Sequence, residues 1–277
     1  MNTTIHEIMT GLERPVRFIF LRHGESEGNV EGKMQGHHDR ILTERGRTQA
    51  AATARWFRNQ QIAVDRVYAS PLRRAWDTAA IVASNAGFPP PLPLDTAMEI
   101  DTGVFTDLTL SEIRLQYPTE YDEFVVGSWE SVPDAESVAT LTKRALSLWQ
   151  TLVDDVGRNG EEPFPSDRTG EVGTTGTKDA AEATVLTVTH GGFLQWILKA
   201  SFGAAPTDPV PWMPLVKAEN CSLFVYHARP VRSRDRNGSP LRWYYGQWSQ
   251  LNYVPADLAG PNLALEEQFH SGGDQAR

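Results

Sequence analysis

The spacing of apolar residues divides the chain into short strands and longer helices. Three runs are too short for a helix and rich in apolar or β-branched residues, and each predicts a buried strand: residues 16–21, 67–69 and 184–189. Three segments repeat apolar residues at steps of three and four, which predicts helices: residues 73–86, 137–152 and 193–200. Residues 43–60 are rich in alanine and are also interpreted as a helix. Thr43 stands where a helix N-cap is expected, and Gly87 stands where a helix ends.

The last part of this pattern predicts a hairpin. Residues 221–226 and 241–248 are strand-like, and Asn237-Gly238 between them is a favoured turn pair. Strands that alternate with helices predict an α/β fold, with helices packed on a central sheet. We expect a polar leader over residues 1–14, one folded domain over residues 15–254 and a flexible tail over residues 255–277. The domain is expected to contain a mobile Gly-rich insertion over residues 157–183.

Composition and charge remove several classes of function. The 277 residues carry 26 Lys and Arg against 35 Asp and Glu, so the net charge is −9 and the surface repels nucleic acid. A bound anion therefore needs a local cationic pocket. Cys221 is the one cysteine, so no internal disulfide can form. The N-terminus lacks the apolar core of a signal peptide, and no apolar run approaches the roughly 20 residues that span a bilayer. We expect a cytoplasmic protein with no membrane partner.

Two of the predicted strands end in a histidine that is followed by glycine. Residues 16–21 lead into Arg22-His23-Gly24, and residues 184–189 lead into His190-Gly191-Gly192. Ligands of α/β sheets bind at the carboxyl ends of strands, and glycine lets the backbone approach an anion closely. The helix that starts after His190 adds a dipole that favours negative charge. The pattern predicts a site for an anion at the two histidines.

These residues belong to a longer series of short motifs. In chain order the motifs are Leu21-Arg22-His23-Gly24-Glu25-Ser26 with Asn29, Gln35-Gly36, Leu42-Thr43-Glu44-Arg45-Gly46, Ser70-Pro71-Leu72-Arg73-Arg74-Ala75, Glu99-Ile100-Asp101-Thr102-Gly103, Glu136-Ser137, Thr189-His190-Gly191-Gly192 and Asn220-Cys221-Ser222. The series resembles that of the histidine phosphatase superfamily, which contains the cofactor-dependent phosphoglycerate mutases and many phosphatases. The resemblance covers about residues 16–254 without the insertion. The fold expected with it is a single-domain, three-layer α/β/α sandwich with a central, mostly parallel sheet.

The resemblance also implies a role for each residue of the site. His23 would attack phosphorus and form a phosphohistidine, His190 would hydrogen-bond the transferring group, and Glu99 would protonate the leaving oxygen. Five residues are expected to bind the substrate or its phosphate: Arg22, Asn29, Gln35, Arg74 and Gly191. Arg74 is preferred to Arg73 because the family's phosphate-binding arginine directly precedes the alanine. One guanidinium group can form two parallel hydrogen bonds with the oxygens of a phosphate. The positive charge of nearby arginines would lower the pKa of His23 and keep its ring neutral.

Other interpretations of these residues stay open. Each histidine could be a hydrogen-bonded structural residue at a strand end, and Asp101 or Asp107 could compete with Glu99 for the role of acid. The run His37-His38-Asp39 invites a metal site, but no histidine pair has the i, i+4 spacing of a helix, so we expect no metal. The basic run from Arg229 to Arg236 is interpreted as a solvated hairpin loop, with an anionic partner as the alternative.

The sequence therefore predicts a metal-independent phosphoric monoester hydrolase that acts on a small phosphorylated metabolite without a cofactor. Two alternatives are a phosphoglycerate-mutase-type isomerase and a phosphate-binding regulatory module without turnover. After Glu99 the chain runs directly into Leu110-Ser111-Glu112-Ile113, as in the family's phosphatases, which favours hydrolysis. Asp134-Ala135 departs from the family's usual glycine pair at that position. The expected partners include a second copy of the chain in a homodimer, but neither nucleic acid nor a membrane.

Overall fold

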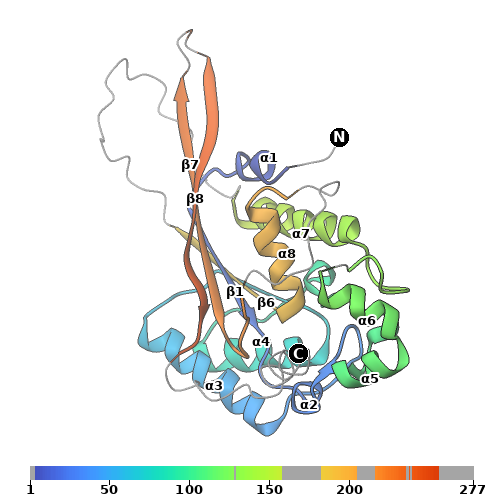
Figure 1. Cartoon of the computed structure of the whole chain (residues 1–277). Coiled ribbons are helices and arrows are strands. Elements are labelled where there is room, and N and C mark those ends of the chain that lie inside the picture. Colours follow the sequence, from blue (N-terminus) through green and yellow to red (C-terminus); the bar gives the residue numbers. More distant parts are fainter. Residues whose placement is uncertain are drawn as a thin grey trace.

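Within the residues that the structure describes, a six-stranded sheet forms the centre of the molecule (Figure 1). The computed structural model describes residues 4–127, 129–157, 182–204, 216–234, 237 and 239–255. The strands lie in the order β4 (Leu92–Pro93), β3 (Arg66–Ala69), β6 (Ala183–Thr189), β1 (Val16–Arg22), β7 (Leu223–Arg234) and β8 (Pro240–Tyr253). The first four strands are parallel, whereas β7 and β8 pair antiparallel. The expected α/β fold with a mostly parallel sheet is confirmed.

Helices cover both faces of this sheet (Figure 1). α3 (Glu44–Asn59) and α4 (Arg73–Ala86) pack on one face, and α7 (Val138–Leu152), α8 (Gly191–Ser201) and the short α1 (Ile5–Met9) pack on the other. β1 contributes to both cores because its side chains alternate. Phe18 and Phe20 lie in the core under α7 and α8, whereas Ile19 and Leu21 lie in the core under α3 and α4. The expected three-layer sandwich is therefore confirmed.

Two of the helices begin or end at the predicted signals, and a third begins at a cap of the same kind. Thr43 caps α3, because its side-chain oxygen accepts a hydrogen bond from the backbone nitrogen of Gly46 at 3.0 Å. Ser137 caps α7 in the same way through the backbone nitrogen of Thr140. α4 ends at Gly87, whose φ of 76° is a left-handed conformation that glycine adopts without strain. No helix in the described part of the chain is long and apolar enough to cross a membrane.

Between β4 and α7 the chain folds into short elements that the apolar spacing leaves unassigned. They are the 3-10 turns η1 (Asp95–Ala97) and η2 (Gly103–Phe105), β5 (Leu108–Thr109), α5 (Leu110–Gln116) and α6 (Pro118–Val125). β5 pairs with β2 (Lys33–Met34), which follows the short α2 (Glu27–Val30), and α7 runs into a π-helical turn, Val153–Gly157. Glu99 lies between η1 and η2, so no strand or helix sets its position.

The first described residues differ from the expected polar leader. The side chain of Thr4 forms a capping box with Glu7 and begins α1. Four apolar side chains of this segment are buried in the same core as α7 and α8: Ile5, Ile8, Met9 and Leu12. The segment looked polar because these residues alternate with outward-facing polar ones over little more than two helical turns. Residues 5–12 are thus part of the folded domain.

The C-terminal hairpin is longer than the sequence pattern predicts, and its upper part projects beyond the rest of the sheet (Figure 1). Arg229 and Arg232 lie within β7, opposite Tyr245 and Arg242, so the expected basic loop is a paired strand over this length. Alternation of apolar and polar residues did not reveal it because most side chains of residues 240–247 are exposed. Residues 158–181 of the expected insertion, residues 235, 236 and 238, and the tail after residue 255 lie outside the described residues.

Candidate active site

The two histidines of the sequence motifs lie side by side at one edge of the sheet. β1 and β6 are parallel neighbours with Arg22 in register with Thr189, so His23 and His190 each follow directly after a paired residue. The backbone nitrogen of His23 donates to the carbonyl oxygen of Thr189 at 3.0 Å, and the centres of the two imidazole rings are 5.1 Å apart. The register of two parallel strands therefore brings together residues that are far apart in the sequence.

His23 presents one ring nitrogen as a free base. Its Nδ1 lies 2.7 Å from the carbonyl oxygen of Gly24, which can only accept, so Nδ1 carries the proton of the neutral ring and Nε2 keeps its lone pair. The side chain is buried, and this burial, together with the charges of Arg74 and Arg22, holds the pKa of His23 well below its ordinary value. A neutral imidazole with an available Nε2 is the form that can attack phosphorus.

Two buried arginines lie close enough to His23 for their charges to act on it. Arg74 is fully buried and donates from Nη1 to the carbonyl oxygen of His38 at 2.9 Å and from Nη2 to that of Gly36 at 2.8 Å. Arg22 donates from Nη1 to the carbonyl oxygen of Ala218. Burial lowers the pKa of Arg74 to about 10 and also lowers that of Arg22. The Nε atoms of both arginines are buried without a hydrogen-bond partner among the described residues, as expected of a site that binds an anion.

Arg73 and Arg74 point in different directions in the structure. Arg74 points into the site, whereas Arg73 is exposed and uses its backbone nitrogen to donate to Asp39 at 2.7 Å. Both follow β3 at the start of α4, and consecutive helical residues point about 100° apart. Only one of the two can therefore face the histidines, and it is the residue that the motif singles out.

His190 begins α8 as its N-cap residue. Its Nε2 lies 2.8 Å from the hydroxyl of Ser70, while its Nδ1 is buried and has no partner among the described residues. Burial and the charge of Arg74 hold the pKa of His190 well below its ordinary value, so this ring is also neutral. A Cβ atom added at Gly191 would lie 3.1 Å from Nε of Arg22, so the glycine permits the close approach of the backbone to that guanidinium.

Glu99 lies on the other side of the α8 N-terminus. Its Oε1 accepts hydrogen bonds from the backbone nitrogens of Phe193 at 2.9 Å and Ile100 at 3.0 Å, and its Oε2 accepts a longer one from Gly192 at 3.3 Å. The carboxylate also contributes a favourable charge interaction to Arg22 and Arg74. The structure therefore brings Glu99 to the same cluster as the two histidines and two arginines, with Oε2 the less firmly held oxygen.

Comparisons with known proteins agree with this geometry. A family model described as the histidine phosphatase superfamily (branch 1) matches residues 18–160, slightly more than half of the chain. The chain belongs to the histidine phosphatase superfamily. The matched region contains His23, both arginines and Glu99, whereas His190 follows it.

Several relatives of this histidine phosphatase are phosphatases. It is 29% identical over 255 residues to a glucosyl-3-phosphoglycerate phosphatase of Mycobacterium tuberculosis, covering 88% of this chain and 99% of the relative. It is 34% identical over 110 residues to phosphoserine phosphatase 1 of Hydrogenobacter thermophilus, an alignment that spans 40% of this chain and about half, 51%, of that relative. The solved structure of a mycobacterial glucosyl-3-phosphoglycerate phosphatase superposes with a TM-score of 0.63 at 23% identity, covering 87% of this chain and 100% of that one, which shows the shared fold. The relatives support a phosphatase activity.

Asn29 and Gln35 contact the loop that follows His23. The Oδ1 of Asn29 accepts from the backbone nitrogen of Ser26 at 3.1 Å and from Nδ2 of Asn220 at 3.2 Å, and this same Nδ2 donates to the carbonyl oxygen of His23 at 3.1 Å. Gln35 is buried and accepts from the hydroxyl of Ser26 at 2.8 Å. Both side chains brace the loop after His23, and their expected contact with substrate stays a prediction.

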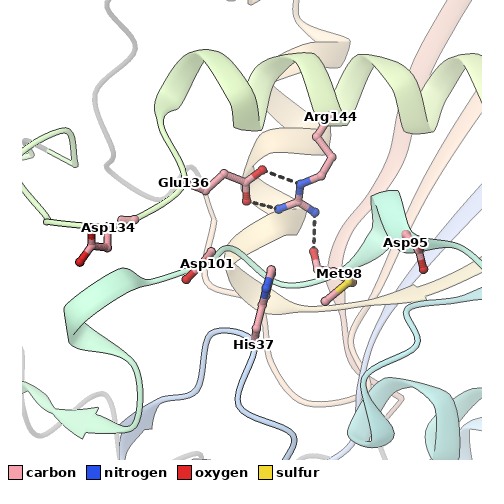
Figure 2. A pocket seen from close by; sticks show the side chains of 8 residues that line it. His37, Asp95, Met98, Asp101, Asp134, Glu136 and Arg144 are labelled. Carbon is pink, nitrogen blue, oxygen red and sulfur yellow. Dashed lines mark hydrogen bonds and ion pairs between the residues drawn. The ribbon is translucent and has the colours of Figure 1, made fainter.

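A cavity of about 280 Å³ adjoins the backbone of Glu99 (Figure 2). Its lining residues are His37, Asp95, Met98, Asp101, Asp134, Ala135, Glu136 and Arg144. Figure 2 shows Arg144 reaching from α7 to Glu136 and to the backbone of Met98. His37 contributes a contact of 2.8 Å between its Nε2 and the carbonyl oxygen of Glu99. Neither His23 nor His190 lines this cavity, so it lies outside the cluster of histidines and arginines.

Each residue of the run His37-His38-Asp39 has a partner within the protein. His37 contacts the backbone of Glu99, His38 lies 3.3 Å from a carboxylate oxygen of Asp107, and Asp39 accepts from the backbone of Arg73. Within the described residues, no group of three or more histidine, cysteine or acidic side chains could hold a metal ion. Asp107 contacts His38 and forms ion pairs with Arg40 and Lys33, and the assignment of the acid to Glu99 stays a prediction.

Sequence reasoning assigned no role to three residues that the structure places in or near the site. Ser70 contacts His190, Asn220 contacts the backbone of His23, and Arg144 holds the backbone around Glu99. Ser70 and Asn220 belong to quoted motifs, so their positions carried a signal even though their contacts did not. Arg144 had no signal, because it lies on the amphipathic helix α7 among ordinary polar positions.

Proposed function

We propose that this histidine phosphatase hydrolyses a small phosphomonoester through a phosphohistidine on His23, without a metal ion or other cofactor. The observation that carries the proposal is the state of His23, whose Nδ1 donates to the carbonyl oxygen of Gly24 and leaves Nε2 as a base under the charges of two buried arginines. The unpartnered Nε atoms of Arg22 and Arg74 supply charge for the oxygens of a phosphoryl group.

In the first step, Nε2 of His23 attacks phosphorus and forms the P–N bond while the bond from phosphorus to the ester oxygen breaks. The carboxyl group of Glu99 gives its proton to the leaving oxygen, which departs as an alcohol. Arg22 and Arg74 balance the charge on the transferring oxygens, and these fixed groups need no rearrangement during the reaction. Glu99 must turn Oε2 towards the leaving oxygen, and its single 3.3 Å contact with Gly192 makes that the easier oxygen to release.

In the second step, water attacks the phosphohistidine from the side that the alcohol has left. The Glu99 carboxylate takes a proton from this water as the P–O bond forms, and the P–N bond breaks to return the lone pair to Nε2. Inorganic phosphate leaves, and Glu99 is again protonated for the next turnover. One carboxyl group serves both directions because the two steps are mirror images of each other.

Replacement of the nucleophile tests this proposal. His23→Ala should abolish release of phosphate from a generic phosphomonoester with the fold intact by circular dichroism, while His227→Ala, a histidine on β7 paired with Glu182, should keep normal activity. A quench of the native enzyme during turnover of a phosphorus-labelled substrate should trap a label that is stable to base and labile to acid on the peptide containing His23. Undiminished activity of His23→Ala would refute the assignment of the nucleophile.

The substrate class follows from the relatives only as a proposal. Relatives are named for glucosyl-3-phosphoglycerate and for phosphoserine, which are both small phosphomonoesters. A panel of phosphorylated metabolites that includes these two, with phosphate release and phosphoglycerate isomerisation measured in parallel, separates the candidates. An isomerase would convert phosphoglycerate without releasing phosphate, and a regulatory module would bind phosphate without turnover.

The remaining partners and the cellular location stay predictions. For the homodimer, a candidate surface among the described residues is β8, along which five large apolar or aromatic side chains are exposed: Leu241, Trp243, Tyr245, Leu251 and Tyr253. Light scattering of the full chain across a range of concentrations would test self-association. A cytoplasmic location is tested by fractionation of the cells that express the protein.

A further inference from the structure

Ser70 occupies the turn between β3 and α4, directly beside His190. Its backbone nitrogen donates to the carbonyl oxygen of Val188 in β6 at 3.0 Å, which ties the turn to the strand that leads to His190. The side chain is fully buried, and its oxygen lies 2.8 Å from Nε2 of His190. The same oxygen accepts a hydrogen bond from the backbone nitrogen of Leu72 at 3.3 Å.

The direction of the contact between Ser70 and His190 follows from the needs of the buried hydroxyl. A serine hydroxyl has one hydrogen to donate, and a buried donor without an acceptor is costly. Among the described residues, Nε2 of His190 is the one acceptor that the Ser70 hydroxyl contacts, since its other partner, the Leu72 nitrogen, is itself a donor. The hydroxyl therefore donates to Nε2, and Nε2 carries no proton.

A neutral imidazole with an unprotonated Nε2 must carry its proton on Nδ1. The ring is neutral because it is fully buried beside Arg74 and Arg22, which both disfavour a second positive charge. Its Nδ1 is buried and has no hydrogen-bond partner among the described residues, like the Nε atoms of Arg22 and Arg74. Three buried donors in one cluster, next to the ring of His23, lack an acceptor that a phosphoryl group would supply.

We propose that Ser70 is a positioning residue that holds His190 in the tautomer protonated on Nδ1, so that this N–H donates to the transferring phosphoryl group. The inference rests on the proposed phosphatase activity and assigns that site a further residue. Without the hydroxyl, both tautomers of His190 become accessible, and the one protonated on Nε2 turns a lone pair towards the negative oxygens. Such a loss weakens the transition state more than the binding of substrate.

The tautomer can be measured without any turnover. Nitrogen chemical shifts of the ¹⁵N-labelled histidine rings, with His190 assigned by its absence in His190→Gln, should show a protonated Nδ1 and an unprotonated Nε2 in the native protein. Addition of inorganic phosphate should move the Nδ1 resonance more than that of Nε2. In Ser70→Ala the two nitrogens should approach averaged shifts. A protonated Nε2 in the native protein would overturn the proposal, whatever the enzyme's activity.

Kinetics supply the second measurement. Ser70→Ala should lower kcat by about 10²-fold with little change in KM, and Ser70→Thr, which keeps the hydroxyl, should recover most of kcat. Ser222→Ala is the matched control, because it removes a buried hydroxyl that has no partner among the described residues, and it should behave like the native enzyme. The acidic limb of the kcat profile should move to higher pH in Ser70→Ala, since the lost hydrogen bond stabilises the neutral ring.

The outcomes separate this proposal from the proposed function. If the native protein shows no phosphatase activity, but has the Nδ1–H tautomer, responds to inorganic phosphate at Nδ1 and loses this tautomer in Ser70→Ala, the function fails and the positioning of His190 by Ser70 stands. If the protein is an active phosphatase and Ser70→Ala matches Ser222→Ala in kcat and in nitrogen shifts, the role of Ser70 fails and the function stands.

Discussion

Arg144 holds together the segment that carries the proposed proton donor, and its removal gives a sharp test of the structure. Its guanidinium forms two hydrogen bonds with the carboxylate of Glu136, from Nε at 2.7 Å and from Nη2 at 2.6 Å. It also donates to three backbone carbonyl oxygens, those of Met98 at 2.7 Å and of Thr96 and Glu99 at 3.2 Å. The perturbation is Arg144→Met, which keeps much of the apolar stem and removes the charge.

The magnitude follows from the exposure of the pair. Only 16% of the Arg144 side chain and 11% of the Glu136 side chain are exposed, so water replaces the lost contacts poorly. Removing one partner of a buried ion pair costs about 3–5 kcal/mol, because the other charge stays buried alone. The partial exposure places Arg144→Met near the lower end, at about 3 kcal/mol, a large share of the roughly 5–15 kcal/mol that stabilises a domain.

The assay is urea unfolding followed by the fluorescence of the buried Trp149 and Trp196. It is applied to the native protein, Arg144→Met, Glu136→Gln and the double variant. Because the two side chains contact each other, the double variant should lose less free energy of unfolding than the two single variants lose together, by about 1 kcal/mol or more. Arg45→Met is the matched control: its ion pair with Glu25 at 3.0 Å has an arginine that is 45% exposed, and its loss should cost less than about 1 kcal/mol.

Two results would refute this reasoning. One is a loss of free energy of unfolding in Arg144→Met no larger than in Arg45→Met. The other is simple additivity of Arg144→Met and Glu136→Gln, which would mean that the two side chains do not stabilise each other.

Three further predictions concern the chemistry of the site. The pKa values of His23 and His190 are held well below the ordinary value by burial and by the neighbouring arginines, so the folded protein stays neutral at both positions when the unfolded chain takes up protons. The free energy of unfolding should thus be at its full value above about pH 6.5. It should decrease as the pH drops from there towards the pKa values of the folded state, by up to about 1.4 kcal/mol per pH unit for each histidine. Urea unfolding at several pH values measures this slope, which His190→Ala should make shallower; an unchanged slope would contradict the assignment. Phosphate release should survive a chelator, and recovery of a lost activity by added metal would overturn the metal-independent mechanism. Glu99→Gln should slow esters with poor leaving groups more than esters with good ones, because only the former need a proton from the acid; an equal loss for both would place the acid elsewhere.

Much of the site could be predicted because its residues stand at the ends of regular elements. The buried runs before His23 and His190 are strands, and parallel strands end at one edge of a sheet, so the two histidines had to meet if β1 and β6 were neighbours. Arg74 was separable from Arg73 by the motif, and the helix then turned one inwards and the other outwards. Glu99 was harder, since an irregular segment carries it and only the resemblance pointed to it.

The sequence alone determined features that depend on neighbouring residues only: the strand β1, the cap of α3 at Thr43 and the end of α4 at Gly87. Tertiary structure alone decided features that depend on contacts between distant residues. The leader became part of the core because α1 is too short to be stable alone and gains its stability from packing against α7 and β8. The guanidinium of Arg144 reaches three carbonyl oxygens, and the hydroxyl of Ser70 reaches His190, only after the sheet has aligned their elements. Hydrogen bonds act over about 3 Å, and no spacing along a chain encodes such a distance between residues more than forty positions apart.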